Sequence, residues 1–433
     1  MVDLMILGGG PAGYHAAGLA AGAGLKTLLL EKRSLGGVCL NEGCIPSKAL
    51  LYSAKIYDFM KGDGEKYGVT CKEPLFDYAA AVKRKDAVVE NLIGGIRAGL
   101  QKSGVEIING QGVIKGKIPG GFEVEAGGTA YHARNLLLCT GSESVTPQIR
   151  GIETALTNRE ILALTEVPKT LAVIGGGVIG LEMASLFNSA GSKVTVYEMM
   201  DKIAGAFDRE ISQELQKVYE KKGVAFKLGA PVKDVAALGC EKTLVCVGRK
   251  PVITGFGLEN LGVPAERGAV LTDDRMKTGV PGVYAAGDIN GKYMLAHTAY
   301  REAEVAVNNI LGRRDLMEYS AIPSVIYTNP EAAGIGETFE SAREKGIATT
   351  ETKLSMQYSG RFVAENEGGT GICKLVWSGD RLIGAHLMGN PCSEIISTLS
   401  AVLYREMSIE QIRKIIFPHP TVAEIIKEAA FHA

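Results

Sequence analysis

The hydrophobic pattern of this chain contains one unit twice. An apolar run, a glycine turn, an amphipathic stretch and a second apolar run ending in an acid occur in LMILGGGPAGYHAAGLAAGAGLKTLLLEK (residues 4–32) and again in LAVIGGGVIGLEMASLFNSAGSKVTVYEM (171–199). This order predicts a buried strand, a helix and a second strand in each copy. The copies are 167 residues apart, since 175 − 8, 180 − 13 and 198 − 31 all equal 167.

Both glycine turns have the spacing of a dinucleotide fingerprint, G-x-G-x-x-G between a strand and a helix, with an acid about 20 residues further on. The first glycine makes the turn, the second admits a pyrophosphate and the third packs the helix on the strand, while the acid accepts hydrogen bonds from a ribose. Glycine turns also occur in nucleotide-free α/β folds, but two colinear copies favour two bound dinucleotides. The residues are Gly8, Gly10, Gly13 and Glu31 in the first copy and Gly175, Gly177, Gly180 and Glu198 in the second.

The acid of the second copy indicates which dinucleotide binds there. Met199 and Met200 follow Glu198, and no arginine is adjacent to bind a 2′-phosphate. A carboxylate repels such a phosphate, so this site is predicted to prefer NAD to NADP.

A third apolar run, GVYAAGDIN (282–290), ends in Gly287 and Asp288. An aspartate at the carboxyl end of a strand in a doubly wound sheet points into the cofactor crevice. A turn or helix-capping aspartate gives the same pattern, so the residues alone leave both interpretations open.

Composition excludes several classes of protein. With 433 residues, 46% hydrophobic residues and a formal net charge of −1, the chain is predicted to be globular and to form several domains, without a basic surface for nucleic acid or membranes. Neither a signal segment nor an apolar run of ~20 residues is visible, so a cytoplasmic location is expected.

Two of the eight cysteines, Cys39 and Cys44, lie close together in GGVCLNEGCIPSK (36–48). Such a pair can be a structural disulfide, part of a metal site or a redox pair. In a reducing compartment a structural disulfide is disfavoured, and no histidine clusters with the cysteines to complete a zinc site.

The order of these motifs, followed by MLAHTA (294–299) and HPTVAE (419–424), resembles the pyridine nucleotide–disulfide oxidoreductases from end to end. Within that family it is similar to the members that oxidise protein-bound dihydrolipoyl groups. The resemblance implies an α/β chain with two Rossmann-like dinucleotide-binding domains and a C-terminal α+β dimerisation domain. The implied boundaries are 1–144 for FAD binding, 145–263 for a shortened NAD domain, 264–318 for a central domain completing the FAD site and 319–433 for the dimer interface.

The resemblance also implies the chemistry. FAD would occupy the first fingerprint and NAD the second, in a homodimer whose partner is a lipoylated carrier, from a 2-oxo-acid dehydrogenase acyltransferase or from glycine cleavage. Cys39 would exchange with the lipoyl dithiol, and Cys44 would pass electrons to FAD. His419, before a cis Pro420, would be the acid/base oriented by Glu424.

Further residues are implied at the cofactors. Lys48 and Glu182 would form an ion pair near the flavin, although both also fit solvated helix charges. Thr421-x-x-Glu424 also fits a capping box, which competes with a catalytic role for Glu424. The remaining residues assigned to the cofactors are Thr140, Gly141, Ser142, Gly248, Gly287, Asp288, Ala296 and His297.

Three features depart from the family pattern. Phe417 stands where a second histidine is common, and Glu42 stands between the cysteines, where a carboxylate facing Cys44 would disfavour its thiolate. The stretch between the strands expected near 224–226 and 244–248 is too short for the usual three-stranded meander. Two other functions therefore remain open, a related NAD(P)H-dependent disulfide reductase and a non-catalytic redox-sensing flavoprotein.

Overall fold

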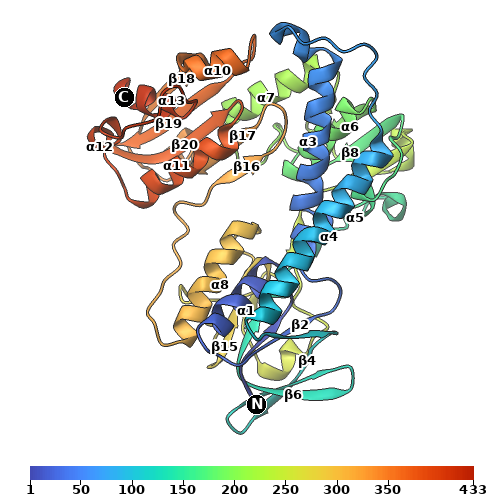
Figure 1. Ribbon diagram of the computed structural model, residues 1–433, viewed down its shortest axis with the longest axis vertical. Coiled ribbons are helices and arrows are strands. Elements are labelled where there is room, and N and C mark those ends of the chain that lie inside the picture. The colour runs from blue at the N-terminus through green and yellow to red at the C-terminus, as the bar shows by residue number, and fades with distance from the viewer. The chain divides into compact units, whose positions relative to one another are not determined.

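The computed structural model describes residues 1–433, which divide into two compact units that alternate along the chain (Figure 1). The first unit comprises residues 1–49, 82–145 and 248–318, and the second comprises 50–81, 146–247 and 319–433. The chain passes between the units five times, and the first two passages lie within the long helices α3 (Cys44–Lys61) and α4 (Tyr78–Lys102). The four-domain division with boundaries at 144, 263 and 318 remains a prediction.

The first unit is built on a seven-stranded sheet with the order β3-β2-β1-β6-β5-β4, with β15 paired to β6. β1, β2, β3, β6 and β15 run parallel, and β4 and β5 are antiparallel additions at one edge. Its strands are β1 (Val2–Leu7), β2 (Thr27–Glu31), β3 (Glu106–Asn109), β4 (Val113–Ile118), β5 (Gly121–Ala126), β6 (Thr129–Leu138) and β15 (Val283–Ala285).

Helices α1 (Pro11–Gly22) and α8 (Ala296–Ile310) pack side by side in this unit (Figure 1). α1 follows β1 directly through the first glycine turn, as the hydrophobic pattern predicts. Leu4, Met5 and Ile6 of β1 are fully buried, because both faces of a parallel sheet are covered. The unit also contains α2 (Gly37–Glu42), β7 (Ser142–Ser144), β12 (Arg249–Pro251), β13 (Ala265–Glu266) and β14 (Ala269–Val270).

The second unit contains the other predicted repeat, in a four-stranded parallel sheet with the order β10-β9-β8-β11. No strand lies between β10 and β11, where the chain forms an isolated bridge from Asp234 to Arg150 and a 3₁₀ turn at Ala236–Leu238. The predicted loss of the meander is therefore confirmed. The elements are α5 (Asn158–Leu162), β8 (Thr170–Ile174), α6 (Val178–Ser189), β9 (Lys193–Tyr197), α7 (Arg209–Lys221), β10 (Ala225–Lys227) and β11 (Lys242–Val245).

The C-terminal part of this unit is a five-stranded antiparallel sheet with the order β16-β17-β20-β19-β18. Trp377 and Phe362 are almost fully buried in its core, which α11 and α13 cover (Figure 1). The elements are β16 (Ser324–Ile326), β17 (Ala332–Gly336), α9 (Phe339–Glu344), β18 (Thr350–Ser355), α10 (Gly360–Glu365), β19 (Ile372–Ser378), β20 (Arg381–Met388), α11 (Cys392–Tyr404), α12 (Ile409–Arg413) and α13 (Glu424–Phe431).

The predicted fold class, two dinucleotide-binding α/β parts and a C-terminal α+β part, is confirmed. No helix is both long and apolar enough to cross a bilayer.

Candidate active site

The first glycine turn brings the backbone of β1 and α1 against the end of β6. Gly8 has φ +106°, and a Cβ there would lie 2.1 Å from the carbonyl oxygen of Cys139. A Cβ on Gly13 would lie 1.8 Å from the carbonyl oxygen of Gly8. Gly10 caps α1 without any side-chain hydrogen bond, so the first N–H groups of the helix stay available for an anion.

The acid at the end of β2 is fixed beside this turn. Oε2 of Glu31 accepts a hydrogen bond from the N–H of Gly9 at 2.6 Å, and Oε1 accepts one from the N–H of Arg33 at 2.7 Å. Each carboxylate oxygen keeps a lone pair for a ribose hydroxyl. The residues of the first copy therefore fit a dinucleotide.

The second turn repeats this geometry. Gly175 has φ +110°, and a Cβ there would lie 2.5 Å from the carbonyl oxygen of Cys246. A Cβ on Gly180 would lie 2.0 Å from the oxygen of Gly175, whereas Gly177, which caps α6, faces open space. Oε2 of Glu198 accepts from the N–H of Gly176 at 2.7 Å, as Glu31 does in the first copy. A second dinucleotide therefore fits here.

Asp288 lies in a hydrogen-bonded group of the first unit. Its Oδ2 accepts from the hydroxyl of Ser142 at 2.5 Å, and Nε of Arg249 donates to that same hydroxyl at 2.8 Å. Burial raises the pKa of Asp288 in spite of the Ser142 hydrogen bond. The aspartate does not cap the helical turn that it opens, because Gly287 occupies the capping position.

The other residues assigned to the cofactors lie in two loops and at the start of one helix of the first unit. Thr140 donates its hydroxyl to the carbonyl oxygen of Val252 at 2.7 Å, while Gly141 and Gly248 both have positive φ. Ala296 and His297 form the first turn of α8, whose N-terminus has no side-chain cap. Arg249 was missed by the sequence reasoning, although it directly follows Gly248 in VGRK.

Cys39 and Cys44 are brought together where α2 ends and α3 begins. Both are partly buried, and no disulfide joins them in this structure. The hydrogen bond with the Cys44 sulfur and burial raise the pKa of the Cys39 thiol, while Lys48, one turn further along α3, lowers it. No group of three or more His, Cys, Asp or Glu side chains could hold a metal ion, so the pair lacks the additional ligands of a zinc site.

Glu42, whose carboxylate would disfavour the Cys44 thiolate if it faced that sulfur, forms an ion pair with Arg33. Oε1 of Glu42 lies 2.6 Å from a guanidinium nitrogen of Arg33, and the glutamate side chain is only 14% exposed. The positive partner compensates the carboxylate, because opposite charges at this distance largely cancel each other's field. Arg33 lies outside the cysteine motif, so the motif alone could not reveal this pair.

A pair of tyrosines near the dithiol was also missed. The hydroxyls of Tyr14 on α1 and Tyr300 on α8 form a hydrogen bond, and their rings meet edge to face at 5.9 Å. Burial raises the pKa of Tyr14, and Cys39 and Cys44 act in the same direction. The sequence shows each tyrosine next to a recognised motif but does not pair them.

His419 and Glu424 form the predicted pair. Nδ1 of His419 lies 3.0 Å from Oε1 of Glu424, whose Oε2 accepts from the N–H of Thr421 at 2.8 Å. The N–H of Thr421 and the hydrogen bond with His419 lower the pKa of Glu424. The His419–Pro420 bond is cis, which confirms that prediction.

The competing capping box is only half formed. The hydroxyl of Thr421 donates to the carbonyl oxygen of Pro418 at 2.9 Å rather than capping the helix, and α13 begins at Glu424 after an uncapped Ala423. The carboxylate of Glu424 thus accepts hydrogen bonds from the Thr421 backbone and from His419 at once. From the sequence alone, helix capping and the histidine pair were alternatives.

Glu182 is not a solvated helix charge. Its side chain is buried in the second unit, and Oε1 accepts from the N–H of Tyr327 at 3.1 Å. Lys48 belongs to the first unit, so its ion pair with Glu182 remains a prediction.

Almost the whole chain matches the models of one protein family. Residues 2–303 match the model of the pyridine nucleotide-disulphide oxidoreductases, and residues 322–430 match the dimerisation domain of the same proteins. The chain belongs to the pyridine nucleotide-disulphide oxidoreductase family. It is therefore an enzyme of the flavoprotein disulfide oxidoreductase type, with FAD and NAD as cofactors.

Curated relatives of this oxidoreductase share its full length. A dihydrolipoyl dehydrogenase of Chlamydia muridarum is 37% identical over all of this chain and 96% of its own length. The enzyme of that name from Thermus scotoductus is 37% identical, with 99% of this chain and 96% of the relative covered. The mitochondrial dihydrolipoyl dehydrogenase of Pisum sativum is 36% identical, with 99% and 90% covered.

Solved structures show the same fold. LpdA from Mycobacterium tuberculosis superposes with a TM-score of 0.89 at 23% identity, covering 100% of this chain and 99% of its own. The HOCl-induced flavoprotein disulfide reductase RclA from Escherichia coli has a TM-score of 0.87 at 26% identity, with 99% of each chain covered.

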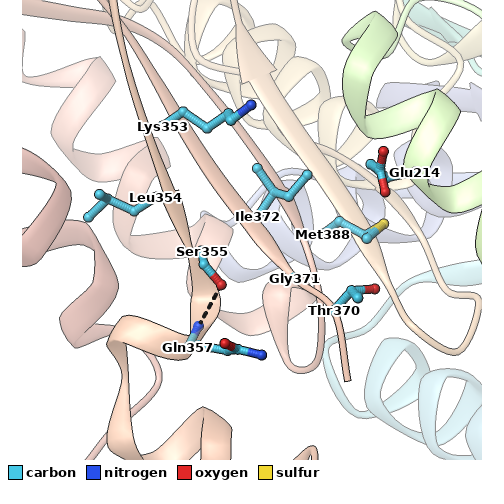
Figure 2. Close-up of a pocket in the computed structure, with 9 residues that line it drawn as sticks. All are labelled: Glu214, Lys353, Leu354, Ser355, Gln357, Thr370, Gly371, Ile372 and Met388. Atoms are coloured by element: carbon cyan, nitrogen blue, oxygen red, sulfur yellow. Dashed lines mark hydrogen bonds between the residues drawn. The ribbon is translucent and has the colours of Figure 1, made fainter. Parts of the chain in front are cut away.

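A cavity of about 260 Å³ lies in the second unit between α7 and the C-terminal sheet (Figure 2). Glu214 of α7 lies across it from Ile372 and Met388 of the sheet. None of the predicted site residues lines this cavity.

Paired substitutions test which fingerprint holds which cofactor. In Gly13→Ala and in Gly180→Ala the new methyl group meets backbone that cannot rotate away, so the strand–helix turn opens. We expect Gly13→Ala to purify with less than half the FAD per chain. Gly180→Ala should keep its FAD and bind NAD at least about tenfold more weakly, equivalent to about 1.4 kcal/mol.

FAD absorbance per chain and calorimetric titration with NAD measure the two effects. Equal FAD loss in both variants would contradict the assignment.

Proposed function

We propose that this oxidoreductase is a dihydrolipoyl dehydrogenase of the cytoplasm that oxidises protein-bound dihydrolipoyl groups and reduces NAD. The observation that carries the proposal is the paired thiols of Cys39 and Cys44, in a chain 37% identical over its whole length to enzymes of that name. The lipoyl dithiol loses two electrons and two protons. NAD takes the electrons with one proton as hydride, and the other proton reaches solvent.

The thiol chemistry follows from the two sulfurs. With the pair oxidised, a lipoyl thiolate attacks the sulfur of Cys39, and the bond to Cys44 breaks to leave the Cys44 thiolate. The second lipoyl thiol then attacks the mixed disulfide and closes the lipoyl ring, which leaves Cys39 reduced. Bound FAD supplies a two-electron carrier between the dithiol and NAD.

The proton steps are assigned to His419. Thiol–disulfide exchange proceeds through thiolates, so a base must take the lipoyl proton, and imidazole titrates near neutral pH. Glu424 accepts a hydrogen bond from the Nδ1–H of His419 and thereby leaves Nε2 free to act as the base. The side chain of His419 is 82% exposed in the single chain and lies within the dimerisation domain, so we propose that it serves the cysteines of the other protomer in a homodimer.

The partner is proposed to be a lipoylated carrier, from the acyltransferase of a 2-oxo-acid complex or from glycine cleavage. A second candidate function is an NAD(P)H-dependent reductase of another disulfide. It is favoured by the 26% identity to RclA, which is named a disulfide reductase.

Anaerobic mixing with dihydrolipoamide tests the proposal. We expect a long-wavelength charge-transfer band from the Cys44 thiolate to the flavin, followed by NADH when NAD is added. A flavin that stays oxidised would reject the lipoyl substrate, and reduction of other disulfides by NADH would then support the second candidate.

Cys44→Ser should lose the band and at least about 10³-fold of turnover, because no thiolate remains to pass electrons to the flavin. The control is Cys71→Ser, which changes an exposed cysteine outside the motif and should keep wild-type turnover. Wild-type turnover in Cys44→Ser would exclude the relay.

Glu424→Gln tests the histidine pair through pH. Because the pKa of Glu424 is lowered, its carboxylate stays ionised through the pH range in which a glutamate ordinarily takes up a proton. It becomes protonated only at lower pH. Between about pH 5 and about pH 9 we expect kcat to fall about 10²-fold in this variant, with the acid limb of the profile moved. Glu428→Gln on the same helix is the matched control, and an equal effect there would contradict a specific role for Glu424.

A further inference from the structure

The segment Met199–Phe207 connects the ribose-binding acid Glu198 to helix α7 in the second unit. Its backbone is tied to the glycine turn, since the N–H of Ala204 donates to the carbonyl oxygen of Gly176 at 2.8 Å. Ala204 has φ +64°, a conformation that L residues with side chains rarely adopt. Contacts with the surroundings must therefore hold this segment in place.

One such contact is made by Asp208, which directly follows the segment and caps α7. Its side chain is fully buried. Oδ1 accepts from the N–H groups of Glu210 and Ile211 at 3.0 and 3.1 Å, which uses one oxygen for the helix. Oδ2 accepts from Nζ of Lys374 at 2.9 Å. The aspartate thus joins the start of α7 to strand β19 of the C-terminal sheet.

Lys374 is equally buried, with 4% of its side chain exposed. Glu351 and Glu210 lie 3.1 and 3.3 Å from Nζ, so three carboxylates surround one ammonium group. Burial alone would lower the pKa of Lys374, but Asp208 and Glu351 raise it overall. Burial alone would raise the pKa of Asp208, but Lys374 and the N–H of Ile211 lower it overall. Both groups therefore stay charged near neutral pH.

Few contacts hold α7 against the C-terminal part, and the Asp208–Lys374 ion pair is one of them. α7 packs beside the C-terminal sheet and contacts its central strand, β20 (Figure 1). The cavity lined by Glu214, Ile372 and Met388 interrupts that packing (Figure 2). At the far end of α7, Lys222 donates to the carbonyl oxygen of Asn329 at 2.7 Å. The helix is therefore attached to the C-terminal part at each end.

The segment held in this way is where the adenosine half of NAD must lie. When Glu198 binds the ribose 2′-hydroxyl, the adenine, carried on the adjacent ribose carbon, lies beside the residues that follow the acid. Those residues are Met199 and Met200, which are 70% and 58% exposed. Large exposed apolar side chains beside a nucleotide site offer a surface for the flat adenine ring.

We propose that Lys374, acting through Asp208, is a positioning residue for the adenosine half of NAD. A lysine of the C-terminal sheet fixes the start of α7, which fixes Met199–Phe207 against the glycine turn. This inference rests on the NAD site described above and on no property of the disulfide substrate.

The test is calorimetric titration of the oxidised FAD-loaded dimer with ADP-ribose and with NAD. Asp208→Asn keeps the helix cap but removes the charge, because asparagine caps helices as well as aspartate does. Lys374→Met removes the other partner. We expect both variants to bind ADP-ribose and NAD about tenfold more weakly, with unchanged FAD content and unchanged flavin reduction by dihydrolipoamide without NAD.

Lys217→Met is the matched control, since it removes a lysine of α7 that pairs only with Glu214 of the same helix and is 60% exposed. It should bind ADP-ribose within about twofold of wild type. ADP-ribose affinity within about twofold of wild type in Asp208→Asn would overturn the inference. A fall in FAD content and flavin reduction in step with nucleotide affinity would also overturn it, because that would indicate a general structural role.

Should Lys374→Met fail to fold, Asp208→Asn decides, because Glu351 and Glu210 still pair Lys374 there. A wild-type flavin that dihydrolipoamide does not reduce, together with weakened ADP-ribose binding in Asp208→Asn, would reject the lipoyl substrate and support this inference.

Discussion

Backbone packs directly against backbone at the two glycine turns, and both nucleotide sites depend on this close approach. A Cβ at Gly13 or Gly180 would lie within about 2 Å of a carbonyl oxygen of the preceding turn. Because no side chain intervenes, the first turn of each helix lies close to the end of its strand. The open N–H groups of that turn then face the position where a pyrophosphate binds.

Carboxylates stabilise the same turns from the neighbouring strands. Glu31 and Glu198 accept the N–H of the middle glycine of each turn, so one acid connects two parallel strands and is oriented for a ribose. Glu424 likewise has two partners, the backbone N–H of Thr421 and the ring of His419. Asp208 caps α7 with one oxygen and binds Lys374 with the other. In each case the two oxygens of one carboxylate perform different tasks, because each accepts hydrogen bonds independently.

The proposed redox centre and its acid/base pair come from different parts of the chain. The cysteines lie at the junction of two helices in the first unit, whereas His419 lies in the dimerisation domain and is largely exposed in the single chain. A base can take a proton from the substrate thiol only when that thiol and the disulfide lie beside it. Dimerisation gives a physical reason for this exposure, since a second protomer can cover the histidine.

The family resemblance implied the cis His419–Pro420 bond and the missing meander. The sequence by itself determined the two strand–turn–helix repeats, their glycines and acids, and the close cysteine pair. These are local features, in which the period of apolar residues and the space around a glycine are set by neighbours in the chain. Only the tertiary structure decided the partners of the charges. Arg33 compensates Glu42, Tyr327 binds the buried Glu182, and Lys374 reaches Asp208 across 166 positions. A sequence shows which groups are charged, but which charges meet, and how deeply they are buried, depends on how strands and helices distant in the chain pack together.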